Sequence, residues 1–261
     1  MAGWDDILRE LGDTPSQTDI VRRKYLKALS NYTGRNTIAY YSAFLTRSVA
    51  GTDINDSDMT GFMNALKGMD CSKGLDLILH TPGGSPAAAE AIVSYLRSKF
   101  HNDIRVIVPQ ISMSAGTMIA CAAKVIIMGK QSSLGPIDPQ FNGIPAYNIK
   151  AEFEEAKADL AVHPENAQYW AIKLQQYPAA FMKTALDAIE LSSNLITVWL
   201  GSCMYNSSIP EEKAIVENIV QQLNEHDRSK THGRHFNIDF CRDIGLKIEE
   251  MEKDLSLIHI S

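Results

Sequence analysis

Three short apolar runs alternate with two helical segments in the first half of the chain, and this alternation limits the fold more than any other feature. The runs at 76–84, 103–110 and 125–129 have the length of buried strands, and the segments 86–100 and 114–123 between them have helical character. Strands that alternate with helices through short links form a parallel sheet with right-handed crossovers. The expected fold class is therefore α/β.

Helical segments flank this core on both sides. The remaining patterns predict helices at 4–11, 17–30 and 58–69, a strand at 37–45, an irregular loop at 132–148, and helices at 149–161, 165–206, 210–224 and 238–244. We expect one α/β core at about 35–160 with helical additions at both ends. The last segment, LSLIHIS (255–261), resembles translated cloning sequence, so its His259 is excluded as a functional candidate.

Composition excludes several classes of protein. The chain carries 31 acidic and 25 basic residues, a net charge of −6, which argues against a dedicated binder of nucleic acid or anionic membranes. The cysteines are scattered and form no CxxC pair, as expected for free thiols in a reducing, cytoplasmic setting: Cys71, Cys121, Cys203 and Cys241. The N-terminus has no signal-peptide pattern, and the charge-free run at 106–123 is too polar for a membrane span.

The candidate chemistry lies in the loops that follow the three core strands. Gly83 and Gly84 end the first strand, where backbone N–H groups can turn toward an anion. Ser114 lies at the next strand-to-helix junction, and Asp138 lies in a loop between two prolines. Each feature alone is commonplace, because such serines usually cap helices and such aspartates usually form turns. Together, at neighbouring strand ends, they indicate a site for acyl transfer.

The same segments carry a family resemblance. DLILHTPGGSPAAAEAI resembles the oxyanion-loop segment of the Clp protease proteolytic subunit and of signal peptide peptidase A, and ISMSAGTMIACAA resembles the segment around their nucleophile, with Ser114 at the serine. SSLGPIDPQ falls where the Clp subunit carries its histidine, but this chain has Asp138 there. The chain is similar instead to the serine dehydrogenase proteinase family, a Clp-like group whose proposed triad runs Ser, Asp, His along the chain.

This resemblance implies a fold and a division of the chain. The fold would be a ClpP/crotonase-like spiral of ββα units with added helices at both ends. A peptidase domain would occupy 35–250, after a helical extension at 1–34 and before a tail at 251–261 that we expect to be non-native. Clp-like subunits form rings, so a homo-oligomer is implied. The helices at 17–30 and 165–206 are candidate interfaces, although their apolar positions equally suit core packing.

The resemblance also implies a catalytic assignment. Ser114 would be the nucleophile, a histidine would take its proton, and Asp138 would orient that histidine. The N–H groups of Gly83 and Ala115 would bind the oxyanion. Of the seven histidines, His232 best matches the family's C-terminal histidine, and His235 is the alternative base. The substrate would be a peptide or an unfolded protein, and no cofactor, metal ligand set or nucleotide motif is indicated.

Three alternatives remain open. A Ser/Lys dyad would use Lys130, Lys150 or Lys157, but a lysine base needs burial to lower its pKa. A crotonase-like acyl-CoA enzyme would share the fold, but it has no evident use for Ser114. The third alternative is a catalytically inactive Clp-like scaffold.

Overall fold

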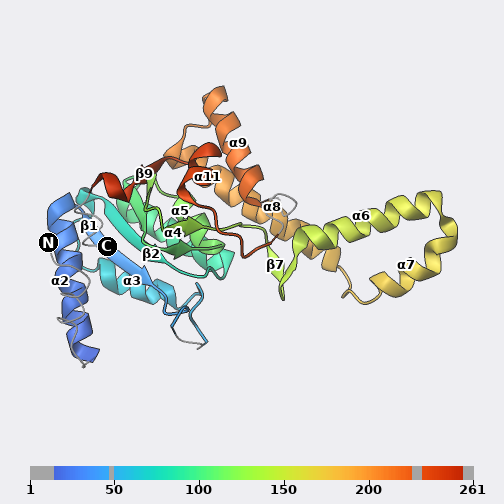
Figure 1. The fold of residues 1–261 in the computed structure, drawn as a ribbon, viewed down its shortest axis with the longest axis horizontal. Coiled ribbons are helices and arrows are strands. Elements are labelled where there is room, and N and C mark those ends of the chain that lie inside the picture. Colours follow the sequence, from blue (N-terminus) through green and yellow to red (C-terminus); the bar gives the residue numbers. More distant parts are fainter. Residues whose placement is uncertain (1–14, 47–49, 225–230, 255–261) are drawn as a thin grey trace.

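The computed structural model describes residues 15–46, 50–224 and 231–254. Its centre is a parallel sheet of five strands in the order β1, β2, β3, β5, β9 (Figure 1). The strands are β1 (Asn36–Tyr41), β2 (Leu75–His80), β3 (Ile104–Val108), β5 (Val125–Met128) and β9 (Ile248–Glu250). The α/β class and the parallel sheet expected from the sequence are thus confirmed.

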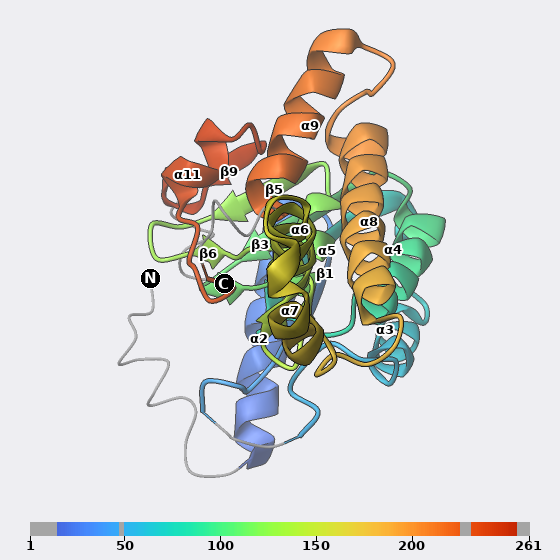
Figure 2. The ribbon, with the colours of Figure 1, turned by 90° about the vertical axis from the view of Figure 1, so that its right-hand side faces the viewer.

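Both faces of the sheet are covered. One face packs against α3 (Asp58–Leu66), α4 (Pro86–Phe100) and α5 (Ala115–Cys121), and the large hydrophobic core lies there. The other face packs against α2 (Pro15–Thr33), whose Leu29 contacts Ile78 of β2. Figure 2 shows α2 and α4 on opposite sides of the sheet. Burial on both faces explains why the core strands are apolar throughout rather than alternating.

Several short strands were not expected. β9 returns the end of the chain to the sheet beside β5, where the sequence showed no strand pattern. The segment 132–148, expected to be irregular, contains β6 (Ser133–Leu134), β7 (Gln140–Phe141) and β8 (Ile144–Pro145). β6 pairs in parallel with another two-residue strand, β4 (Ile111–Ser112). Strands this short are defined by their tertiary partners, so local patterning does not reveal them.

The predicted boundaries of several elements also change. β1 ends at Tyr41, not at residue 45, and α3 ends at Leu66, not at residue 69. The helical region 165–206 is divided: the short turn Pro164–Asn166 leads into α7 (Ala167–Leu174), and α8 (Phe181–Trp199) begins only after Pro178. A proline cannot continue a helix, because it lacks the N–H donor and its ring clashes with the preceding turn. The predicted helix at 4–11 and the tail 255–261 lie outside the described residues.

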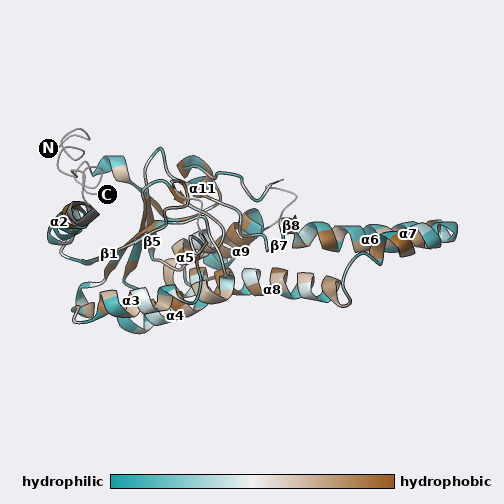
Figure 3. Cartoon of the chain, turned by 90° about the horizontal axis from the view of Figure 1, so that it is seen from below, coloured by the Kyte–Doolittle hydropathy of each residue, from teal (hydrophilic) through white to brown (hydrophobic). Residues whose placement is uncertain are grey.

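A helical arm leaves the core. α6 (Ala146–Val162) and α7 extend away from the sheet as an arm, and α8 runs back beside α6 (Figures 1 and 3). A small core of its own, which includes Phe141, Phe153 and Phe181, holds the base of the arm together. α9 (Pro210–Asn224) and α11 (Ile238–Asp243) pack against the main core through buried residues such as Ile219 and Ile238. Among the described residues, no helix is both long and apolar enough to cross a membrane.

Candidate active site

Ser114 occupies a strained turn between β4 and α5. Its φ is 49° and its ψ is −118°, a conformation that L-residues adopt rarely and at a cost of about 1–3 kcal/mol. The side chain makes no capping hydrogen bond to α5, so the ordinary role of a serine at a helix start is not what fixes it here. The residue is partly exposed. The turn therefore holds the hydroxyl out of the helix, toward solvent.

Gly83 packs directly against this turn. Its φ is +104°, and a Cβ atom added to it would lie 2.7 Å from Ser114 Cβ and 2.8 Å from the Met113 carbonyl oxygen. The opposite side of the loop is held by residue 54: Ile54 N–H donates to Gly83 O at 2.7 Å, and Ser85 N–H donates to Ile54 O at 2.8 Å. Only glycine satisfies both the positive φ and the close approach.

Two backbone N–H groups lie at this turn. The Ala115 N–H opens α5, where no preceding turn supplies a carbonyl, and it has no hydrogen-bond acceptor within the described part of the chain. The Gly83 N–H is occupied, because it donates to Thr81 Oγ1 at 3.2 Å. The first turn of α5 thus offers a free donor at a helix N-terminus, which favours a developing negative charge.

Asp138 and His232 form a close pair on the other side of the site. Asp138 Oδ1 and His232 Nδ1 are 2.8 Å apart, and the Asp138 side chain is fully buried while that of His232 is 30% exposed. The second carboxylate oxygen accepts a hydrogen bond from Gln140 Nε2 at 2.7 Å. An ionised carboxylate only accepts, so the proton of neutral His232 is on Nδ1. Nε2 is then free to accept a proton, as a general base requires.

Three adjacent segments bring these two halves together. β4 leads into Ser114, and it pairs with β6, which leads into the Asp138 loop. Residue 134 of β6 also bridges Phe236, four positions after His232. Met113 packs against Gly135, where an added Cβ would lie 2.5 Å from the Met113 methyl carbon. No hydrogen bond joins the Ser114 hydroxyl to His232 among the described residues, and catalytic hydrogen bonds often tighten only when substrate binds.

The remaining histidines have other surroundings. The exposed His235 lies 2.7 Å from Ser133 Oγ through Nδ1, so it is paired apart from Asp138. His80 is buried, stacks on Tyr41 at 4.5 Å between ring centroids, and has no hydrogen-bond partner for either ring nitrogen within the described ranges. His101 and His163 are exposed, while His226 and His259 lie outside the described residues.

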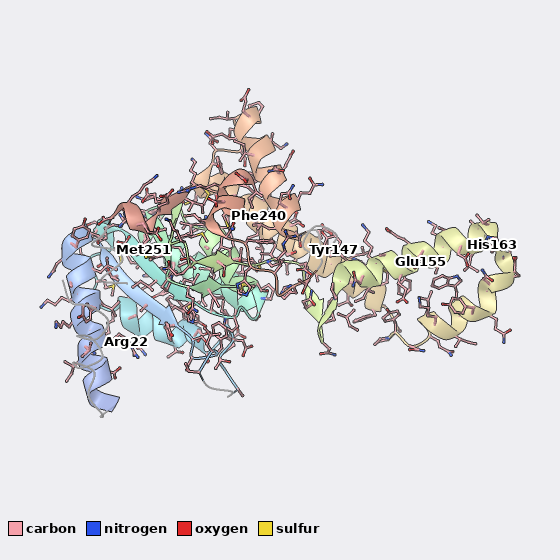
Figure 4. All side chains as sticks on the ribbon, viewed as in Figure 1. Arg22, Tyr147, Glu155, His163, Phe240 and Met251 are labelled. Carbon is pink, nitrogen blue, oxygen red and sulfur yellow. The ribbon has the colours of Figure 1, made fainter. Side chains whose placement is uncertain are left out.

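The lysines of the alternative dyad are not buried. Lys130 and Lys157 are exposed, and Lys150 lies 3.8 Å from Glu154 in an ion pair along α6. Figure 4 shows Glu155 and His163 well out along the arm, and Lys157 lies between them in the sequence. None of the three has the burial that would make a lysine a base at neutral pH.

Sequence reasoning missed two residues that shape this site. Gln140 holds Asp138, and its position two residues after the aspartate, across Pro139, was the available signal. Thr117 on α5 accepts from Gly135 N–H and donates to Ser112 O, each at 2.9 Å, and so ties α5 to the loop that carries Asp138. Nothing in the sequence distinguishes Thr117 from any other buried threonine. The described residues contain no cluster of three or more potential metal ligands.

The chain is similar in sequence to a known protein family and to two archaeal proteins. Residues 21–164, more than half of the chain, match the family model described as ClpP-like SDH-type serine proteinase. The chain is 36% identical over 149 residues to the uncharacterized protein MJ0137 of Methanocaldococcus jannaschii, an alignment that covers 56% of this chain and 52% of that protein. It is 45% identical over 75 residues to the uncharacterized protein MJ1495 of the same organism, covering 29% of this chain and 25% of that protein. The chain thus spans about half the length of MJ0137 and a quarter of MJ1495.

Proposed function

Because the chain belongs to the ClpP-like SDH-type serine proteinase family, we propose that it is a serine peptidase in which Ser114 attacks the scissile carbonyl. His232 is the general base, and Asp138 orients His232. The observation that carries this assignment is the pairing of a buried carboxylate with His232 Nδ1, because it leaves Nε2 unprotonated. The strained turn that presents the Ser114 hydroxyl supports it independently.

The proposed reaction has two stages. His232 Nε2 takes the proton of Ser114 as the hydroxyl oxygen bonds to the substrate carbonyl carbon, and Asp138 stabilises the imidazolium that forms. The N–H groups of Ala115 and Gly83 receive the developing oxyanion, and loss of one such donor typically lowers the rate about 10²–10³-fold. The imidazolium then protonates the leaving amine. His232 then takes a proton from water, whose oxygen bonds to the acyl carbon. The bond from that carbon to Ser114 Oγ breaks, the acid product leaves, and the imidazolium returns its proton to Ser114.

The wider architecture is part of the same proposal. The family membership supports a ClpP/crotonase-type spiral of ββα units. Within it, the proposed peptidase domain occupies 35–250 and follows a helical extension at 1–34. Such a subunit would work as a cytoplasmic homo-oligomer on peptides or unfolded proteins. The activity of the whole protein is part of this proposal, because both relatives are described only as uncharacterized and the chain matches about half of one and a quarter of the other.

Covalent labelling tests the assignment. A fluorophosphonate probe forms a bond to an activated serine, so the wild-type protein should be labelled and should hydrolyse an unstructured fluorogenic peptide. Ser114→Ala should lose both signals, and His232→Ala should lower both at least 10³-fold. Ser112→Ala is the matched control, because it removes a hydroxyl two residues before Ser114, at the end of β4, and should change neither.

Each other outcome decides against the proposal. Full labelling of Ser114→Ala would show that another residue reacts. Full activity of His232→Ala with loss in His235→Ala would make His235 the base. Absence of labelling and hydrolysis in the folded wild-type oligomer would favour the inactive scaffold.

A further inference from the structure

We propose that Thr81 is a positioning residue that sets the Gly83 N–H for the oxyanion, an inference that rests on the peptidase function proposed above. Thr81 follows β2 and comes two residues before Gly83, and its side chain is fully buried. Thr81 connects the glycine loop, through Gly83, with the segment that leads into and out of Ser114.

The backbone of Thr81 is fixed to the strand that carries the nucleophile. Thr81 N–H donates to Ile111 O at 3.0 Å, and Met113 N–H donates to Thr81 O at 3.1 Å. These two bonds form a parallel bridge centred on Ser112, two residues before Ser114. The strand end before the glycine loop therefore cannot shift without moving the Ser114 turn.

The two branches of the side chain have different partners. The methyl group packs against the Cα of Gly116 in the first turn of α5, where an added Cβ would collide with it. The hydroxyl oxygen accepts the Gly83 N–H at 3.2 Å. A threonine thus joins the helix after Ser114 to the loop that packs on Ser114, which neither serine nor valine can do alone.

The hydroxyl contact fixes the plane of the peptide that carries the Gly83 N–H. Glycine at φ +104° has wide conformational freedom, so this peptide would otherwise rotate. At 3.2 Å the bond lies at the long end of the usual range. A charged oxyanion is a stronger acceptor than a neutral hydroxyl. As charge develops, the Gly83 N–H can therefore turn toward the oxyanion or form a bifurcated hydrogen bond to both oxygens. Thr81 therefore keeps the donor oriented before the reaction and yields it during the reaction.

Substitutions separate the two branches. Thr81→Val keeps the shape and removes the hydroxyl, so we expect kcat to fall about 10–100-fold, with KM within threefold of wild type. Thr81→Ser keeps the hydroxyl and removes the methyl group, so kcat should stay within threefold while the melting temperature falls. If Thr81→Val does not fold, Thr81→Ser and Thr81→Ala give the same comparison, because they differ only by the hydroxyl.

A second readout excludes a merely structural effect. A peptide boronic acid forms a tetrahedral adduct whose oxygen occupies the oxyanion position, so loss of the hydroxyl should weaken boronate inhibition by the same factor as kcat. The pH profile of kcat/KM should keep its apparent pKa, because the His232 pair is not disturbed.

The outcomes distinguish this inference from the function on which it rests. Wild-type kcat in Thr81→Val, or an equal loss in Thr81→Ser, would overturn the role of Thr81 while an inactive Ser114→Ala upheld the peptidase. An active Ser114→Ala would overturn the peptidase assignment itself.

Discussion

The contact between Gln140 and Asp138 predicts how an amide at position 138 would disturb His232. Gln140 Nε2 donates to Asp138 Oδ2 at 2.7 Å, so in Asp138→Asn the new amide must place its oxygen there. Its NH₂ group then faces His232 Nδ1, which lies 2.8 Å from the replaced oxygen. An NH₂ group facing Nδ1 requires that nitrogen to accept, which moves the proton to Nε2. The proposed base, His232, is thus held in the wrong tautomer.

The magnitude has two sources. Two unit charges about 4 Å apart at an effective dielectric of about 20 interact by about 4 kcal/mol, which is about 10³ in rate when the imidazolium loses its carboxylate. The tautomer change adds to this, and a comparable substitution in another serine protease costs about 10⁴. We therefore expect Asp138→Asn to lower kcat about 10³–10⁴-fold. The assay is peptide hydrolysis as a function of pH.

A second substitution should restore part of the activity. Gln140→Glu replaces the donor by an acceptor, so in the double variant the new amide at 138 turns its NH₂ to residue 140 and its oxygen to His232 Nδ1–H. Rescue of at least tenfold over Asp138→Asn is expected. Gln140→Glu alone places two carboxylates together and should be impaired. A loss below tenfold in Asp138→Asn, or no rescue in the double variant, would refute the reasoning.

Three further predictions concern single residues. Gly83→Ala should abolish hydrolysis, because its Cβ would lie 2.7 Å from Ser114 Cβ, whereas Gly61→Ala on α3 meets open space and should leave the rate unchanged; matched kinetics check this. Asp76→Asn should lower the free energy of unfolding by about 3–5 kcal/mol in urea titrations, because the fully buried Asp76 carboxylate binds two arginines at 2.7 Å; a change under 1 kcal/mol would contradict it. Burial lowers the pKa of His80, so the unfolded state binds more protons than the folded state below about pH 6.5, and the protein should lose stability as the pH falls through that range. His80→Phe should reduce this loss of stability, measured as the difference between the melting temperatures at pH 8 and pH 5.5.

The elements predicted well were those whose causes are local. α4 begins and ends where the sequence placed it, because Pro86 takes the first helical position and Ser85 accepts a hydrogen bond from Ala88 N–H. The three core strands were equally visible, because burial on both faces demands continuous apolar runs. β9 was missed, because its three residues, Ile-Glu-Glu, become a strand only by pairing with β5.

The site divides in the same way. Ser114 and Gly83 could be singled out because a strand end, a helix start and paired glycines are visible in the sequence. The sequence alone left two histidines as candidate bases, and the structure separates their partners: Asp138 for His232 and Ser133 for His235. Gln140 and Thr81 act through contacts with residues already named, so their roles depend on three-dimensional neighbours that no local pattern encodes.

The strain at Ser114 is maintained by its neighbours. A residue in this conformation would relax unless the surrounding structure fixed the chain on both sides. Thr81 fixes the strand before it, through Ile111 and Met113, and Thr117 fixes the helix after it by bonds to Ser112 and Gly135. If these contacts hold the strain, weakening them should relax the turn. Thr117→Val should then slow fluorophosphonate labelling of Ser114 by more than the fraction of protein unfolded, calculated from its lower melting temperature, would explain. A decrease in labelling rate equal to that unfolded fraction would show that Thr117 serves stability alone.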